Sequence, residues 1–482
     1  MVDTEVLLSH ALERASKRGA SYSEVRYQAD TGTGIMLKNG VPEVASSIDK
    51  TGIGLRVIVG GSLGFGATNK LTKAGILKLV DDAIARAKAS SPVVSNPTHM
   101  SEEQLGHDKV EVKPRIKFDN VEFDQVVELL KEADSASVVA AKPKGVELVS
   151  RMLELTSAVT HKHIITSDGG DVESKIPRNS FYYFLVGIHP QRGSAQRTSE
   201  RGESRGWEAV ESWDLVEVLG REGATMARVL AEGVPPPKDQ VDVLAGGEVI
   251  GLVCHESSGH PQEADRIMGR EAAQAGESYL SLTSLGMEVG SQVVNVVDDP
   301  TIPRSFGFYL YDEECVKARK RYLIKEGRIN EFLQNRETAA VTGTSSNAAA
   351  RATSYDREPI IRMANTYMEP GDHSFDELIE DIKHGVFIKN FTEWNIDDRR
   401  FNQKYVGLEA YSIENGELGV PVRNPAIEMT TVGFFKAVDA VGSDLMHWAA
   451  TCGKGDPMQG APVWTSGPTV RLRNLRLGGA QA

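Results

Sequence analysis

The sequence predicts an α+β protein with two domains, and three observations support this prediction. The chain has 482 residues, which is long for a single domain. Helical and strand-like segments alternate in the first half, whereas strand-like segments predominate in the second. Three consecutive prolines in VPPPK, residues 234–238, stiffen the chain between the halves. We therefore expect an N-terminal α+β domain over residues 1–233 and a β-rich C-terminal domain over residues 234–482.

The first half is predicted to contain a unit of helices and antiparallel strands twice in succession. Apolar residues at helical spacing predict a helix over residues 3–19, and alternating segments bounded by Gly, Asn and Pro predict strands over residues 23–61. A helix over residues 71–89 follows. The later elements are predicted as helices over 123–136 and 145–157, strands over 158–188 and a helix over 213–233. We infer an internal duplication of a helix-plus-meander unit.

The second half is predicted to be mainly β-structure that carries a metal site. The strand-like segments are QVDVLAG (240–246), VVNVVDD (293–299) and the hairpins YLIKEGRINEFL (322–333) and EAYSIENGELGVPV (409–422). The expected helices cover residues 247–260, 374–384 and 427–440.

Charge and composition argue against two classes of partner. The chain has 67 acidic and 54 basic residues, a formal net charge of −13, so binding to nucleic acid is disfavoured. The N-terminal residues do not resemble a signal peptide, and no apolar run is long enough to span a membrane. The three cysteines, Cys254, Cys315 and Cys452, are an odd and low number, which favours reduced thiols and a cytoplasmic protein.

HESSGH, residues 255–260, resembles a zinc-protease motif with one residue too many. The common motif H-E-x-x-H has its histidines four apart, whereas His255 and His260 are five apart. Residues five apart in a regular helix differ in direction by roughly 140°, so these imidazoles would point to different faces. A local π-type turn, or a helix end, would bring both toward one metal ion. Gly259 tolerates unusual backbone angles, and Pro261 ends regular hydrogen bonding just afterwards.

Glu256 and one further ligand would complete a hydrolytic metal site. Glu256 follows His255 directly, so it could take a proton from water and pass it to a leaving amine. A catalytic zinc ion typically takes three protein ligands, and Cys452 is a candidate because it lies where a strand-like segment runs into a Gly- and Pro-rich loop. The alternative is that His255, Glu256 and His260 are ordinary residues at a helix end, and that Cys452 is a small buried hydrophobe. The residue types alone leave both interpretations open.

The remaining cysteines and one histidine pair have simpler interpretations. Cys254 adjoins His255 but would point about 100° away from it on a helix, so we interpret Cys254 and Cys315 as packing residues. His161 and His163 share one face of a predicted strand, and we interpret them as solvated strand histidines.

The second half of the chain resembles the TldD/PmbA family in several segments that occur in the family order. The matching segments are HESSGHPQEAD, YDEECVKARKRYLIKEGRINEFLQNRETA, PIIRMANTYMEPG, ENGELGVPVR, VGSDL and CGKGDPMQGAPVWTSGPTVRLRNLRLGG. They cover most of residues 240–480, whereas the first half matches mainly in pattern. The family comprises intracellular zinc metallopeptidases that process modified peptides and degrade unfolded ones, so the resemblance implies a zinc-dependent peptidase.

The resemblance also implies specific site residues and an assembly. Carried over to this chain, the zinc ligands of the family are His255, His260 and Cys452, and the catalytic carboxylate is Glu256. The family implies a dimer, either with itself or with a paralogue, that encloses a cavity and holds an extended peptide by strand addition. One departure lies around the second histidine, where Pro261 could alter how the helix ends. The supporting roles of Glu263 and Asp265 are therefore left open.

Two other functions compete with a zinc peptidase. The family includes partners that lack the motif and bind no metal, so a non-catalytic subunit is the alternative; the intact motif argues against it. Some members carry a label as modulators of DNA gyrase, which suggests a nucleic-acid-associated regulator. The net charge of −13 and the absence of a recognised nucleic-acid-binding motif argue against that function.

Overall fold

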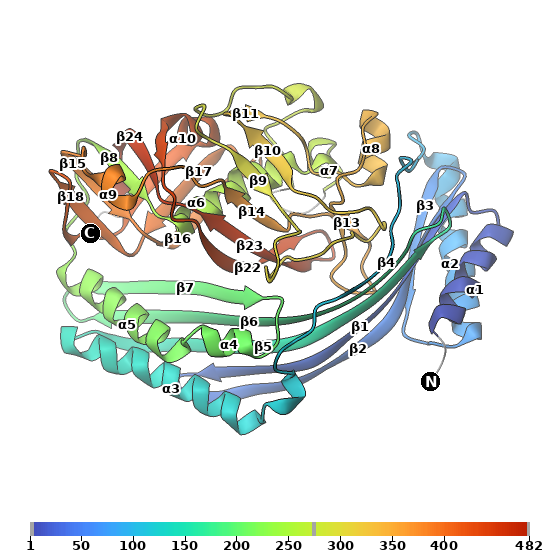
Figure 1. The fold of residues 1–482 in the computed structure, drawn as a ribbon, viewed down its shortest axis with the longest axis horizontal. Helices are drawn as coiled ribbons and strands as arrows, with labels where there is room; N and C mark the ends of the chain where they lie inside the picture. The colour runs from blue at the N-terminus through green and yellow to red at the C-terminus, as the bar shows by residue number, and fades with distance from the viewer. Residues whose placement is uncertain (1–3, 272–275, 480–482) are drawn as a thin grey trace.

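A long, curved sheet connects the two halves of the chain (Figure 1). The computed structural model describes residues 4–271 and 276–479. The sheet has 13 strands in the order β11-β10-β9-β14-β23-β22-β7-β6-β5-β1-β2-β3, with β4 paired to β6. The first half supplies β1 (Tyr22–Lys38), β2 (Val41–Val59), β3 (Ser62–Thr68), β4 (His107–Glu111), β5 (Glu147–Thr166), β6 (Asp171–His189) and β7 (Gly193–Glu203). The second half supplies β9 (Val296–Asp298), β10 (Arg321–Lys325), β11 (Arg328–Ile329), β14 (Asn365–Met368), β22 (Met446–Lys454) and β23 (Gln459–Gly467).

Helices cover the outer face of this sheet at both of its ends (Figure 1). They are α1 (Thr4–Lys17) and α2 (Lys73–Ser90) at one end, and α3 (Phe123–Ala141), α4 (Glu208–Ser212) and α5 (Leu215–Glu232) at the other. Val25, Ile35 and Leu37 of β1 all lie in the apolar clusters beneath these helices. Because they are separated by even numbers of residues, they share one face of the strand. Burial of each such side chain contributes roughly 1.5–3 kcal/mol.

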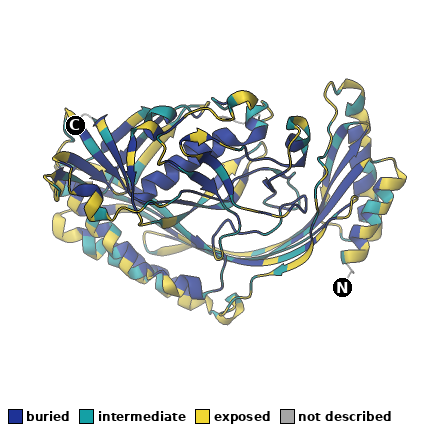
Figure 2. Cartoon of the chain, turned by 45° about the horizontal axis from the view of Figure 1, so that its top comes forward, coloured by how far each residue is buried: buried dark blue, intermediate teal, exposed yellow. Residues whose placement is uncertain are grey.

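The inner face of the sheet is covered by the second half of the chain. The even-numbered residues of β1 alternate with these apolar residues and point to the inner face. Arg26 of β1 forms an ion pair with Glu313 at 3.3 Å, and Gln28 donates to the Thr353 carbonyl at 3.1 Å. Figure 2 shows that buried residues occupy both the curved strands and the interior of the second half. At these positions of β1, the inner face of the sheet carries polar and charged side chains, whereas the outer face is apolar.

The second half contains two further sheets of six and four strands around a buried helix. The six strands run in the order β19-β18-β15-β8-β24-β21 and the four in the order β16-β17-β20-β25. Their bounds are β8 (Gln240–Ala245), β15 (His384–Ile388), β16 (Phe391–Ile396), β17 (Asn402–Gly407), β18 (Ala410–Glu414), β19 (Glu417–Pro421), β20 (Pro425–Thr430), β21 (Val438–Val441), β24 (Val470–Arg476) and β25 (Gly478–Gly479). A two-stranded pair joins β12 (Ala350–Arg351) and β13 (Ile360–Ile361). The central helix, α6 (Gly247–Cys254), is buried along its whole length and packs on β14, β22 and β23.

The mixed α+β fold is confirmed, and so are most predicted elements of the first half. Helix, three antiparallel strands and helix occur twice, as α1-β1-β2-β3-α2 and as α3-β5-β6-β7-α5. The predicted helix over residues 145–157 is wrong, because this segment forms the first part of β5. Leu153 and Leu155 alternate into the apolar face, and β5 hydrogen-bonds to β1 on one side and β6 on the other. Tertiary pairing thus overrides the helical spacing of the apolar residues.

In the second half, the hairpins β10–β11 and β18–β19 are confirmed, but two helices are shorter than predicted. The predicted helix 427–440 is only α10 (Thr431–Ala437), flanked by β20 and β21. The Thr430 side chain accepts a hydrogen bond from the Gly433 N–H and so caps the helix at its first turn. The predicted helix 374–384 is only α9 (Phe375–Ile379).

The expected domain boundary at residues 233 and 234 stays a prediction. Strands of both predicted domains join the same sheet, because β22 pairs with β7 at Ala449 and Glu200. Among the described residues, no helix is both long enough and apolar enough to cross a membrane.

Candidate metal centre

Widening of a helix brings the two motif histidines together. After α6, residues His255–Gly259 form a π-helical turn, and His260–Gln262 continue as a 3-10 turn. The predicted π-type turn is thereby confirmed. The extra residue in the turn offsets the longer spacing of the motif, so both imidazoles point to the same side. Their ring centroids are 4.9 Å apart, with an interplanar angle of 82°.

Gly259 is required by close packing, not by unusual backbone angles. Its φ of −57° and ψ of −64° are ordinary right-handed helical values that any residue can adopt. The predicted reason for a glycine here is therefore wrong. A Cβ atom at this position would lie 1.8 Å from the Met363 sulfur, inside van der Waals contact. The π-turn thus packs directly against Met363, which lies two residues before the start of β14.

Replacing Gly259 with alanine is expected to destabilise the protein and weaken metal binding. The new methyl group must displace Met363 or the π-turn itself, and overpacking of this kind typically costs about 1–3 kcal/mol. The check is the midpoint of chemical denaturation together with metal content. Gly286→Ala is unsuitable as a control because its φ is positive, whereas Gly220→Ala in α5 meets only the Ala136 methyl group at 3.9 Å. A Gly259→Ala protein as stable as the wild type would contradict the packing explanation.

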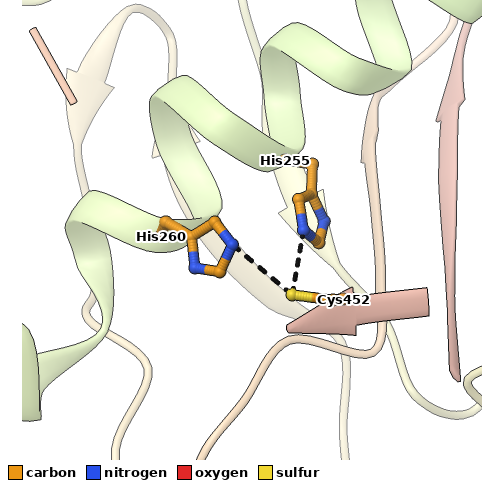
Figure 3. Close-up of side chains that lie close together, drawn as sticks. All are labelled: His255, His260 and Cys452. Carbon is orange, nitrogen blue, oxygen red and sulfur yellow. Dashed lines mark hydrogen bonds between the residues drawn. The ribbon is translucent and has the colours of Figure 1, made fainter. Parts of the chain in front are cut away.

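Cys452 lies against both histidines (Figure 3). It belongs to β22, where it pairs with Ala461 of β23, so it lies within a hairpin strand and not at a strand end. Its Sγ atom is 3.3 Å from His255 Nε2 and 3.4 Å from His260 Nε2. All three side chains are buried, and the three donor atoms lie within 4.8 Å of one another. The structure thus brings together the three predicted ligands from opposite ends of the second half.

The donor set fits a zinc ion. With Zn–N near 2.0–2.1 Å and Zn–S near 2.3 Å, nitrogen and sulfur ligands of a tetrahedral ion lie about 3.6 Å apart, close to the observed separations. Burial lowers the pKa of His255 and lowers that of His260 to about 4, so both imidazoles are neutral near pH 7. Burial alone would raise the pKa of the Cys452 thiol, but His260 and Arg362 outweigh it and lower that pKa to about 7. Neutral imidazole and thiolate are the forms that bind metal.

Glu256 lies beside this cluster and pairs with a residue that the sequence did not single out. One carboxylate oxygen of Glu256 accepts a hydrogen bond from Arg400 Nη1, and both side chains are buried. Arg400 precedes β17 and has a φ of +62°, in the left-handed region that non-glycine residues rarely adopt. Its carbonyl accepts a hydrogen bond from Thr431 Oγ1 at 2.9 Å, which helps to hold this backbone conformation. Glu256 is thus oriented without being one of the three clustered donors.

Glu263 supports the second histidine, which answers one question that the sequence left open. Its Oε2 lies 3.0 Å from His260 Nδ1, so it can accept the ring N–H and leave Nε2 free for a metal. Burial opposes ionisation of Glu263, but nearby cations led by Lys454 hold its pKa well below its usual range. Arg266 also donates to Glu263 at 2.6 Å.

Asp265 contacts Lys454, which in turn contacts Glu263. Both carboxylate oxygens of Asp265 accept from Lys454 Nζ at 2.8 Å, and the same ammonium lies 3.2 Å from Glu263. Lys454 is the last residue of β22, two positions after Cys452. Asp265 and Lys454 therefore connect the histidine-bearing segment to the cysteine-bearing strand.

The cluster opens into a cavity of about 300 Å³ between the second half and the inner face of the curved sheet. His255, Glu256, His260 and Cys452 line one wall. The opposite wall comes from the first half and includes Tyr182, Thr198 and Glu200, and Trp394 and Trp448 add aromatic surface. Burial raises the pKa of Glu200 to about 7. The sequence does not predict these cavity residues, because they lie on β6 and β7, whose alternating pattern is that of ordinary strands.

The predicted packing roles of the two other cysteines agree with the structure. Cys254 lies in the central apolar cluster, and Cys315 lies in a small cluster with Ile164 and Val172. The two strand histidines are less solvated than predicted, because His161 lies 2.9 Å from Glu173 and the His163 side chain, only 15% exposed, lies 2.8 Å from Asp171.

Three sequence profiles match successive parts of the chain. They are described as PmbA/TldA metallopeptidase domain 1 (residues 23–87), central domain (residues 116–231) and C-terminal domain (residues 238–479). A metalloprotease from Methanothermobacter thermautotrophicus is 30% identical over 480 residues, covering 99% of both chains. A zinc metalloprotease TldD homolog from Saccharolobus solfataricus is 26% identical, covering 97% of this chain and 99% of the relative.

Two crystal structures share the fold at low sequence identity. TldE from Thermococcus kodakarensis superposes with a TM-score of 0.76 at 17% identity, covering 98% of this chain and 100% of TldE. A putative modulator of a DNA gyrase from Thermotoga maritima gives a TM-score of 0.76 at 18% identity, covering 99% of this chain and 100% of its own. The matching profiles and the curated relatives are named for metallopeptidases, which is the class of protein that this chain is similar to. The chain belongs to the TldD/PmbA family.

Proposed function

We propose that this chain is a zinc-dependent peptidase that hydrolyses peptide bonds in extended or unfolded peptides. The convergence of His255, His260 and Cys452 beside Glu256 carries the proposal. We assign the first three residues as zinc ligands and Glu256 as the catalytic base. Two imidazoles and one thiolate form a donor set used in catalytic zinc sites, with a fourth position left open.

The chemistry divides between the metal and the residues around it. A zinc ion bound here would polarise the substrate carbonyl and lower the pKa of water. Glu256 would accept a proton from the attacking water and later donate it to the leaving amine. Arg400 keeps the Glu256 carboxylate in position, and Glu263 holds the His260 ring in the tautomer with Nε2 unprotonated.

The strands at the cavity offer a place for an extended peptide. β22 pairs with β7 at Ala449 and Glu200, and within residues 4–271 and 276–479 the following residues of β22 have no strand partner on that side. Ala450, Thr451 and Gly453 line the cavity there, opposite Thr198. A peptide that adds as a strand at this edge would be read mainly through its backbone, which suits broad specificity.

Metal analysis and a cleavage assay test the proposal directly. We expect about one zinc per purified chain, and cleavage of an unfolded polypeptide that a chelator abolishes and added zinc restores. The expected dependence follows because a zinc ion at the cluster would supply the Lewis acid that polarises the substrate carbonyl. Purified protein that binds no zinc would favour a metal-free partner subunit, and undiminished cleavage in the chelator would overturn the metal mechanism.

We further propose that the enzyme is a cytoplasmic dimer, with itself or a paralogue, that has no nucleic-acid partner. The three cysteines are free thiols, as in a reducing compartment, and the net charge is −13. Light scattering at micromolar concentration is expected to give twice the chain mass, alone or after mixing with the paralogue. A monomer under both conditions would contradict the dimer, and salt-sensitive DNA binding near physiological ionic strength would contradict the last part.

A further inference from the structure

A second cavity, of about 160 Å³, lies on the same inner face of the curved sheet. β5 and β6 form one wall, and β12 with the start of β23 forms the other. None of the residues around it line the metal-side cavity. The two cavities are nonetheless close, because Pro462 in the wall of the second pairs with Thr451 in the wall of the first.

Two arginines in this wall lack a carboxylate partner among the described residues. Arg178 donates to the carbonyls of Phe306 and Phe308 at 3.0 and 2.9 Å. Arg351 donates to the carbonyls of Met363 and Pro462 at 2.5 and 3.0 Å. Backbone carbonyls satisfy some of the N–H groups but do not neutralise the charge.

The acidic residues nearby are engaged elsewhere. Glu313 pairs with Lys162 and with Arg26, so one carboxylate already serves two cations. Asp312 accepts hydrogen bonds from the backbone N–H groups of Glu314, Val316 and Ala350 at 3.0–3.2 Å. The lining of the cavity therefore has more cationic than anionic charge available.

Burial makes this excess of positive charge costly. Arg351 is only 8% exposed, and Arg178 is half-buried. Burial, with the repulsion from Arg351, lowers the pKa of Arg178 to about 10, and burial with repulsion from Arg362 also lowers the pKa of Arg351. A buried cation is stable when an anion pairs with it, so the cavity is suited to an anionic group from outside the chain.

We propose that this cavity binds the C-terminal carboxylate of a peptide substrate through Arg178 and Arg351. The planar guanidinium fork matches a carboxylate in two parallel hydrogen bonds. The identification of a peptide rests on the proposed peptidase function. Arg178 lies on the same face of β6 as Tyr182, which lines the metal-side cavity, four residues along the strand. That separation is about 13 Å, the length of about four residues of extended peptide.

The test compares two unfolded peptides that differ only in a C-terminal carboxylate or a C-terminal amide. Their dissociation constants are measured by fluorescence anisotropy on the zinc-loaded Glu256→Gln protein, which prevents turnover. We expect the carboxylate peptide to bind about tenfold more tightly than the amide. Adding Arg178→Gln should remove the preference, and Arg178→Lys, which keeps the charge but not the fork, should retain part of it. Arg319→Gln is the matched control, because it removes an exposed arginine paired with Glu331 outside the cavity.

The binding measurements test the carboxylate site independently of peptide hydrolysis. Equal binding of the two peptides by the otherwise unaltered Glu256→Gln protein would overturn the carboxylate site while leaving peptide hydrolysis intact. A preference that survives Arg178→Gln in a folded protein, verified by its melting temperature, would also overturn it. If Arg178→Gln does not fold, displacement of the carboxylate peptide but not the amide by acetate supports the site. Displacement of both peptides equally by acetate would show that the C-terminal carboxylate makes no contact of its own, and would overturn the proposal.

Discussion

Glu256→Gln is expected to remove nearly all peptide hydrolysis while leaving zinc and fold in place. Glutamine has almost the same shape and can still accept a hydrogen bond from Arg400 through its amide oxygen. It cannot take a proton from water, and general acid–base groups typically contribute about 10²–10⁴-fold to rate. Zinc content, melting temperature and cleavage of an unfolded polypeptide, measured side by side, test this expectation.

A matched control comes from the same buried helix. Glu248 forms an ion pair with Arg197 at 2.7 Å, so Glu248→Gln also removes a buried glutamate–arginine pair. This control should lose stability and much less turnover: Glu248 lines the same cavity, but both of its carboxylate oxygens bind Arg197 and it does not follow a histidine of the cluster. If Glu256 serves only to hold Arg400, the two variants should behave alike. A folded, zinc-loaded Glu256→Gln protein that cleaves at near wild-type rate would rule out the base.

Cys452→Ala is expected to lose zinc almost completely. It removes one of three proposed ligands, so the loss in affinity should exceed the roughly 10–100-fold that is typical when only an outer partner of a ligand is removed. The Cys452 thiol lies within 3.4 Å of both imidazoles, whereas Cys254 and Cys315 lie in apolar clusters outside this group of donor atoms and are not expected to replace it. Zinc per chain, measured after dialysis against buffered zinc, is the quantity to compare.

Cys254→Ala and Cys315→Ala are the controls for the thiol. Both side chains are fully buried in apolar clusters, so these changes should lower stability but retain zinc. Full zinc occupancy in Cys452→Ala would exclude this residue from the site. Loss of zinc in all three variants would point to a general effect on folding.

The metal-binding cluster was predictable from sequence to the extent that it is local. The spacing of His255 and His260 implies a widened helix, because a regular helix would separate their directions, and the π-turn has that form. The position of Cys452 depends on how β22 lies against α6, which no local pattern specifies. Its assignment came from family resemblance.

Other parts of the site could not be predicted, for identifiable physical reasons. Arg400 approaches Glu256 from a loop whose conformation depends on Thr431, and Glu200 reaches the cavity from the first half of the chain. The segment 145–157 has apolar residues that suit a helix, yet β6 pairs with it from Glu147 onward and β1 from Met152 onward. The sequence suggests that Gly259 supplies backbone flexibility, but only the tertiary position of Met363 explains why this residue has no side chain.

The separation of the clustered residues along the chain has a thermodynamic consequence. His255 and Cys452 are 197 residues apart, so an unfolded chain must close a very long loop to engage both. In the chain-entropy description such a closure costs about 5 kcal/mol. The denatured ensemble would therefore compete poorly for zinc, holding it at most through the neighbouring histidines. Nearly all of the free energy of zinc binding then adds to native stability, in proportion to the logarithm of free zinc. The ion would serve as a reversible cross-link between the π-turn that follows α6 and β22, so free zinc would set the stability of the fold as well as the proposed activity.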